Sequence, residues 1–129
     1  MKKHEFHLRV YYEDTDIAGI VYYANYLKFI ERGRSEFLRH SGVDQAALLA
    51  RQRTAFAVRY LKAEFLRPAG FDDWLRVETE LLRCTGARLI LAQRVLRGQE
   101  LVFSAEVTLA CITESGRPTR IPGPVTALI

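Results

Sequence analysis

The pattern that most restricts the fold of this chain is a single long amphipathic helix followed mainly by strand-like segments. Apolar side chains recur at helical spacing from Tyr22 to Leu38. Apolar and polar residues alternate from Phe6 to Tyr12, and four more strand-like runs follow the helix, at residues 56–65, 75–81, 89–95 and 101–111. Short turns join these four runs, which favours antiparallel pairing. We therefore predict an α+β domain in which a five-stranded antiparallel sheet wraps around one long central helix.

Length and composition are typical of one globular domain. The chain has 129 residues, of which 49% are hydrophobic and 26% charged, and no repeat or linker divides it. We expect a single domain over residues 1–129. No apolar run approaches the roughly 20 residues that cross a bilayer, and the first residues, MKKHEFHLRV, alternate where a secretory leader would be continuously apolar. We expect a cytoplasmic location and no membrane span.

Several positions refine the helical part of this prediction. Gly33 lies within the apolar stripe, where glycine costs about 1 kcal/mol relative to alanine, so we expect the helix backbone to pack closely on the sheet. Gly42 can take the left-handed conformation that ends a helix. Asp44 can cap a short extra helix in DQAALLARQR. The tail from Pro118 onward is predicted to be irregular.

The stretch YYEDTDIAGIVYYANYLKFIERGR, residues 11–34, places carboxylates directly before the helix. On a strand, Asp14 and Asp16 would point to the same side, as in paired-carboxylate sites. The alternative is that EDTD is a polar turn in which an aspartate caps the helix. Gly19 lies where the chain must bend between these acids and the helix.

The position at which the helix starts determines which backbone N–H groups are free to bind a ligand. A start near Tyr22 or Tyr23 has no Ser, Thr or Asp just before it, so its first backbone N–H groups are unfilled, whereas Asn25 could cap a later start. Unfilled N–H groups at the positive end of a helix polarise a carbonyl or hold an oxyanion. A nearby carboxylate can attack that carbonyl or activate water, and this combination is what acyl transfer requires.

These residues resemble the signature of the hotdog-fold acyl-CoA thioesterases, in the YbgC-like and 4-hydroxybenzoyl-CoA thioesterase group. The motif Asp-x-Asp-x-x-Gly-x-Val is followed by an aromatic pair and by Asn-Tyr, and the later segment EFLRPAGFDDWLRVET is also similar. The order of strands and helix resembles that fold from about Phe6 to Ile112. The resemblance implies hydrolysis of an acyl-CoA to a free acid and coenzyme A.

Carried over by position, Asp16 is the residue that this family uses as nucleophile or general base. The resemblance places the backbone N–H of Tyr23 where the thioester carbonyl is polarised, and it makes Gly19, Val21 and Tyr22 the expected substrate-binding residues. Some YbgC-like members carry histidine at the position of Tyr23, whereas this chain has tyrosine, as in the 4-hydroxybenzoyl-CoA type. The acyl preference therefore stays open between the two branches.

Two neighbouring assignments accompany this one. Asp14 is expected to be structural and to fix the loop through backbone N–H groups. Tyr22, Tyr23 and Tyr26 would form apolar walls for the acyl group, although Tyr26 also suits the core of the domain.

Other side chains give no competing chemistry. Cys84 and Cys111 lie in separate strand-like runs, so reduced thiols are expected. His4 and His7 face opposite sides of one strand and are interpreted as surface residues. We expect no metal site and no redox cofactor, since coenzyme A is part of the substrate and leaves as a product.

The charge and the resemblance together suggest partners. The net charge of +4 suits the phosphates of coenzyme A, with nucleic acid or a plain solvated surface as alternatives, and we predict no nucleic-acid partner. Candidate phosphate contacts are Arg59, Lys62, Arg88, Arg117 and Arg120. The resemblance implies dimers that join their sheets, often as a homotetramer, with each active site at a subunit interface.

Two other functions remain open at this point. One is hydrolysis of acyl groups carried by acyl carrier protein. The other is a non-catalytic acyl-binding or scaffold role, because YbgC-like members are associated with envelope machinery.

Overall fold

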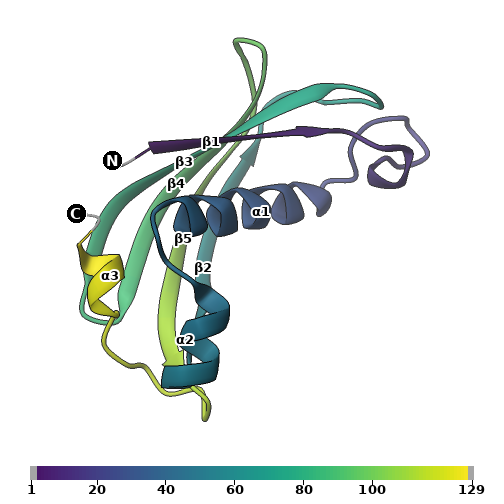
Figure 1. Cartoon of the computed structure of the whole chain (residues 1–129). Helices are drawn as coiled ribbons and strands as arrows, with labels where there is room; N and C mark the ends of the chain where they lie inside the picture. The colour runs from purple at the N-terminus through teal and green to yellow at the C-terminus, as the bar shows by residue number, and fades with distance from the viewer. Residues whose placement is uncertain (1–2, 128–129) are drawn as a thin grey trace.

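The computed structural model describes residues 3–127. Five strands form one antiparallel sheet in the order β1-β3-β4-β5-β2. The strands are β1 Lys3–Arg9, β2 Thr54–Phe65, β3 Trp74–Thr85, β4 Arg88–Arg97 and β5 Glu100–Thr113. The helices are α1 Asn25–His40, α2 Gln45–Gln52 and α3 Gly123–Thr126. The sheet curves around α1, as Figure 1 shows, which confirms the predicted architecture.

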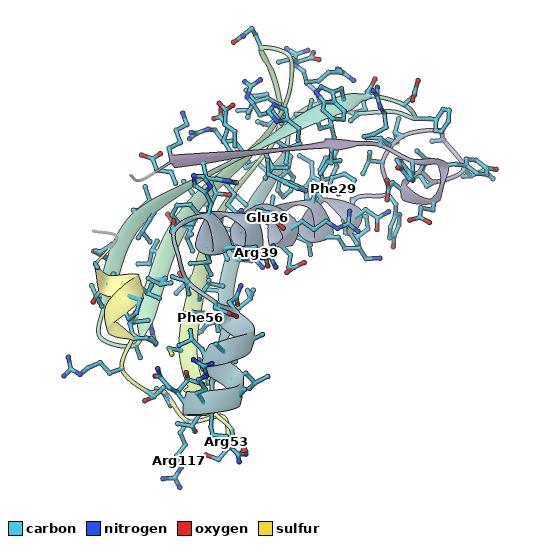
Figure 2. All side chains as sticks on the ribbon, viewed as in Figure 1. Phe29, Glu36, Arg39, Arg53, Phe56 and Arg117 are labelled. Carbon is cyan, nitrogen blue, oxygen red and sulfur yellow. The ribbon has the colours of Figure 1, made fainter. Side chains whose placement is uncertain are left out.

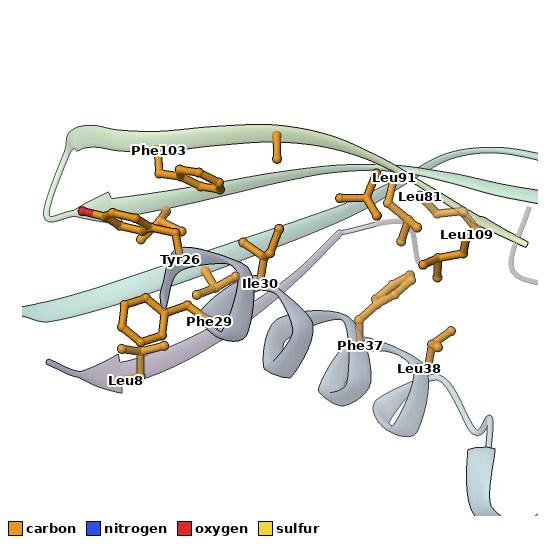
Figure 3. Packing of buried hydrophobic residues seen from close by; sticks show 14 of the residues in the cluster. Leu8, Tyr26, Phe29, Ile30, Phe37, Leu38, Leu81, Leu91, Phe103 and Leu109 are labelled. Atoms are coloured by element: carbon orange, nitrogen blue, oxygen red, sulfur yellow. The ribbon is translucent and has the colours of Figure 1, made fainter. Parts of the chain in front are cut away.

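The core lies between α1 and the concave face of the sheet. Helix α1 contacts β1, β3 and β4, whereas α2 contacts β2. The apolar stripe of α1 points toward the strands (Figure 3), and its buried side chains are Tyr26, Phe29, Ile30, Phe37 and Leu38. Burial of a side chain of this size contributes about 1.5–3 kcal/mol, so this stripe holds the helix on the sheet.

Gly33 permits the close approach of α1 to β3. A Cβ atom at this position would lie 2.6 Å from Val77 Cγ1 and 3.3 Å from Thr79 Oγ1. The first distance is shorter than any real Cβ contact, so no side chain fits without movement. The predicted close packing at Gly33 is confirmed.

The ends of the helices follow local chemistry. Gly42, with φ of +89°, takes the left-handed conformation after α1. Asp44 Oδ1 accepts the N–H of Ala47 at 3.0 Å and so caps α2, as predicted. The tail differs from the prediction, because residues 123–126 form the short helix α3, with Val125 buried against the core.

The segment before α1 also differs from the prediction. Strand β1 ends at Arg9, and Tyr12–Asp14 form a short 3-10 turn. Asp14 and Asp16 therefore do not share a face of the first strand. EDTD forms a turn, as the alternative interpretation held, but neither aspartate caps α1. Helix α1 begins at Asn25, between the two starts that the sequence left open, with Ala24 in the cap position and no side chain capping it.

The structure also shows the surroundings of the two cysteines and of the histidines on β1. Cys84 and Cys111 are free thiols, as predicted. His7 is exposed and stacks on Trp74, but His4 is half-buried, with its ring 5.4 Å from that of His40 on α1. The surface interpretation is wrong for His4, because β1 brings it against the end of α1.

Candidate active site

A tight loop carries Asp16. Thr15 and Val21 form an isolated antiparallel bridge that closes this loop. Within it, the N–H of Asp16 donates to the carbonyl of Ile20 and the N–H of Gly19 donates to the carbonyl of Asp16, both at 2.9 Å. Gly19 has φ of +80°, a conformation that favours glycine. The bend predicted at Gly19 is therefore part of a hydrogen-bonded turn.

Asp14 joins this loop to the start of α1. Its Oδ2 accepts the N–H of Tyr11 at 2.8 Å. Its backbone carbonyl accepts both the N–H of Tyr22 and the side-chain amide of Asn25, each at 2.9 Å. These bonds agree with the structural role predicted for Asp14.

The first open N–H groups at the helix start belong to Tyr23 and Ala24. Within residues 3–127, neither backbone N–H donates a hydrogen bond, whereas that of Tyr22 is used by Asp14. Both groups lie at the N-terminal end of α1, where the helix dipole is positive. They can therefore donate to a carbonyl oxygen and stabilise the charge that develops on it.

An open, largely apolar pocket of about 360 Å³ adjoins Tyr23. It is lined by Ile20, Val21, Tyr23, Tyr26, Phe65, Leu66, Arg67 and Pro68. The ring of Tyr26 stacks on Phe103 with centroids 4.9 Å apart, and burial raises the pKa of its phenol. Tyr26 thus belongs to the core as well as to the pocket floor.

The structure brings together only some of the predicted site residues. Val21 and Tyr23 line the pocket, but Gly19 and Tyr22 do not. Asp16 is exposed in the single chain, and its Oδ1 accepts the N–H of Ala18 at 2.9 Å. The predicted contact between this carboxylate and the helix amides is not formed within one chain, so the roles of Asp16, Gly19 and Tyr22 stay predictions.

The segment after β2 supplies a pocket wall that sequence reasoning did not assign. Phe65, Leu66 and Pro68 come from EFLRPAG, in which a strand stops and turns. The sequence signal for this wall was the presence of apolar residues directly before a turn that contains proline and glycine. Gly70 extends this wall to the Asp16 loop through its bridge with Ile20.

Asp73 and Arg97 hold this wall in place. Asp73 Oδ2 accepts the N–H of Gly70 at 2.8 Å and a guanidinium N–H of Arg97 at 2.7 Å. Arg97 also donates to the carbonyl of Pro68 at 3.2 Å. Burial alone would raise the pKa of Asp73, but the bonds from Gly70 and Arg97 and the charge of Arg97 outweigh it and lower that pKa.

A second hollow, of about 400 Å³, lies at the corner between α1 and α2. Its two charged side chains already have partners, since Arg39 pairs with Glu36 and Asp44 caps α2. We therefore place the candidate site at the apolar pocket. Over residues 3–127, no three His, Cys, Asp or Glu side chains gather in an arrangement that could hold a metal ion.

Comparison with known proteins identifies the family. A family model for the thioesterase-like superfamily matches residues 10–129. The chain belongs to that superfamily. Like the proteins it resembles, this thioesterase-like chain has the hotdog fold, with one sheet curved around α1.

The similarity to two curated relatives spans most of both chains. The thioesterase-like chain is 41% identical over 122 residues to the acyl-CoA thioester hydrolase YbgC of Escherichia coli O6:H1, covering 93% of this chain and 90% of that protein. It is 44% identical over 107 residues to the acyl-CoA thioesterase YbgC of Haemophilus influenzae, covering 83% and 79% of the two.

Solved structures show the same fold. A probable thioesterase from Bartonella henselae superimposes with a TM-score of 0.90 at 42% identity, covering 93% of this chain and 99% of that one. The 4-hydroxybenzoyl CoA thioesterase from Pseudomonas sp. strain CBS-3 superimposes over 100% of both chains with a TM-score of 0.92, at 20% identity. None of the helices within residues 3–127 has the length and apolar character needed to cross a membrane.

Proposed function

We propose that this thioesterase-like chain hydrolyses acyl-CoA thioesters to a free acid and coenzyme A. The observation that carries the proposal is the pair of open N–H groups at Tyr23 and Ala24, which lie at the start of α1 beside an apolar pocket. The thioester carbonyl oxygen binds these N–H groups, and the acyl group enters the pocket. The names of the YbgC relatives, which are acyl-CoA thioesterases, support this choice of substrate.

Asp16 supplies the attacking group in this proposal. In one route its carboxylate attacks the thioester carbonyl, the electron pair moves to an oxyanion held by the N–H groups, and collapse expels the thiolate of coenzyme A. Water then cleaves the resulting anhydride. In the other route Asp16 takes a proton from the water molecule that attacks. Both routes need the same carboxylate near the same amides.

A second subunit completes the site in this proposal. Asp16 is exposed in one chain, yet a carboxylate reacts best where bulk water is excluded. Strand β2 is an edge of the sheet, and its exposed apolar side chains Val58, Tyr60 and Phe65 are 51%, 53% and 52% exposed. Such an edge is normally covered by pairing. We propose a homo-oligomer, of dimers or tetramers, that joins along β2.

The predicted phosphate contacts are part of the same proposal. Arg117 lies at the α2 end of the molecule, opposite the loop that carries Asp16 (Figures 1 and 2). In this proposal, Arg117 meets coenzyme A that is bound in the pocket of another subunit. A cytoplasmic location stays a prediction.

A panel of thioesters tests the proposed function. The purified chain is incubated with short aliphatic, long aliphatic and aromatic acyl-CoA substrates, and released thiol is measured. The same acyl groups on acyl carrier protein are assayed in parallel. We expect turnover of at least one acyl-CoA, and faster turnover on coenzyme A than on the carrier protein. Thiol release at the buffer rate across the panel would contradict the proposal and leave an acyl-binding role.

A further inference from the structure

We propose that Gln93 is a positioning residue for this reaction. Its hydrogen bonds fix the position of α1 along the sheet, and with it the N–H groups of Tyr23 and Ala24 that receive the thioester oxygen. This inference rests on the proposed function.

Gln93 lies on β4, the middle strand of the sheet, and is fully buried, with 0% exposure. Its Nε2 donates to the carbonyl of Ile30 on α1 at 2.9 Å and to Thr79 Oγ1 on β3 at 2.8 Å. Its Oε1 accepts a guanidinium N–H of Arg34 on α1 at 3.1 Å. Both N–H donors of the amide and its oxygen are therefore hydrogen-bonded. Any movement of this buried group would break at least one of these bonds without a replacement from water.

Gln93 makes the direct hydrogen bonds between α1 and the sheet. In the part of the chain that the structure describes, residues 3–127, no other sheet side chain hydrogen-bonds to this helix. The remaining contacts come from the apolar stripe seen in Figure 3. Apolar packing is non-directional, whereas hydrogen bonds weaken steeply with distance and angle. The stripe therefore holds α1 on the sheet, and Gln93 sets where along the sheet it stops.

Gly33 makes these bonds possible. The absence of a side chain there lets the helix backbone approach β3, where Val77 and Thr79 lie beneath it. At this separation a glutamine side chain can reach a carbonyl in the middle of the helix. Gly33, Thr79 and Gln93 thus form one contact between helix and sheet.

The helix carries a displacement at this contact to the active site. Ile30 is five residues from the first residue of α1, a distance of about 8 Å along a rigid helix. A shift of α1 by a fraction of a turn moves the open N–H groups by the same amount. A misplacement of about 1 Å at reacting groups can cost about 100-fold in rate, so the reaction is more sensitive to this contact than is the folded state.

The test compares two variants of β4 that both lose buried contacts. Gln93→Met removes the three hydrogen bonds with little change of volume, and Val95→Ala removes buried apolar contact from the same face of the same strand. We expect both to lower Tm. Only Gln93→Met should lower kcat by about tenfold or more while KM stays within about twofold. A kcat that follows Tm equally in both variants, or an unchanged kcat in Gln93→Met, would overturn the inference.

A second variant keeps the test decisive if Gln93→Met does not fold. Gln93→Glu keeps the size of the side chain and the bond from Arg34 but loses the N–H donors to Ile30 and Thr79, so we expect the same fall in kcat. Wild type and Asp16→Asn are measured in the same assay. An inactive wild type would reject the proposed function itself, whereas an active wild type with an unaffected Gln93→Glu would reject only the role of Gln93.

Discussion

The side-chain amide of Asn25 donates a hydrogen bond of 2.9 Å to the backbone carbonyl of Asp14. The same carbonyl accepts the N–H of Tyr22. Asn25, the first residue of α1, thus holds the loop that carries Asp16 against the helix start. The sequence suggested that Asn25 could cap the helix, but its side chain bonds to the loop instead. This carbonyl is a direct link between the segment that carries the Asp16 carboxylate and the helix start that carries the open amides.

Asn25→Asp tests this link. The substitution keeps the shape of the side chain but places an acceptor against the Asp14 carbonyl, so the loop should separate from the helix start. We expect kcat to fall by about tenfold or more, with KM less affected. Thr15→Val is the matched control, because it removes a 2.8 Å bond to the carbonyl of Tyr12 inside the same loop without touching the helix. Equal losses in the two variants would show that general loosening of the loop is responsible.

Tyr23→Phe separates the backbone of Tyr23 from its hydroxyl. The proposal uses only the N–H, which the substitution leaves in place, and the side chain is 61% exposed. We expect kcat to stay within about threefold of wild type, a change well below that caused by removing an oxyanion donor. A fall of about 100-fold in kcat would mean that the phenol of Tyr23, and not its N–H, stabilises the transition state.

Gly33→Ala should destabilise the fold. In an open helix alanine would stabilise by about 1 kcal/mol over glycine, but the added methyl group would lie 2.6 Å from Val77 Cγ1. We expect a net loss of about 1–3 kcal/mol in the free energy of unfolding, as for other overpacked sites. Combining it with Val77→Ala removes the clashing atom, and urea unfolding of the four proteins should give a favourable coupling energy. Additive effects would mean that the clash is not the cause.

The pair Asp73–Arg97 predicts a pH dependence of stability. The pKa of Asp73 is lower in the folded chain than its ordinary value, because the Gly70 and Arg97 bonds outweigh the effect of burial. Its contribution is therefore complete above the ordinary pKa of about 3.9 and is lost as pH falls through the lower, folded pKa. We expect Asp73→Asn to be less stable than wild type at pH 7, with the difference shrinking below about pH 4. A difference that stays constant down to pH 2.5 would contradict this account of the pocket wall.

Much of the fold could be predicted from periodicity and local chemistry. The stripe from Tyr26 to Leu38 located α1 to within a few residues. The close packing at Gly33, the end of α1 at Gly42 and the cap of α2 at Asp44 were also predicted correctly. The start of α1 stayed open between Tyr22 or Tyr23 and a later start capped by Asn25. The structure places it at Asn25 itself, and the N–H of Tyr22 is used by Asp14. Spacing alone cannot show that the N–H of Tyr22 is bonded to a backbone carbonyl eight residues earlier in the chain.

The site was less predictable, because its parts come from segments that are distant in sequence. Phe65 and Pro68 meet Tyr23 only when the turn after β2 folds beside the start of α1. Gln93 is a polar residue in a largely apolar strand, and its hydrogen bonds to Ile30 and Thr79 join three segments that are distant in sequence. The exposure of Asp16 depends on whether a second subunit covers it, and no pattern within one sequence specifies that contact.

The most direct measurement is acyl-CoA hydrolysis by Asp16→Asn, with Glu13→Gln as a neighbouring, exposed carboxylate control. Both variants are checked for unchanged Tm and oligomeric state before thiol release is measured on the best substrate of the panel. We predict that Asp16→Asn lowers kcat by at least about 100-fold, while Glu13→Gln stays within about twofold. Turnover by Asp16→Asn within a few-fold of wild type would contradict the claim that Asp16 attacks the thioester or activates the water that does.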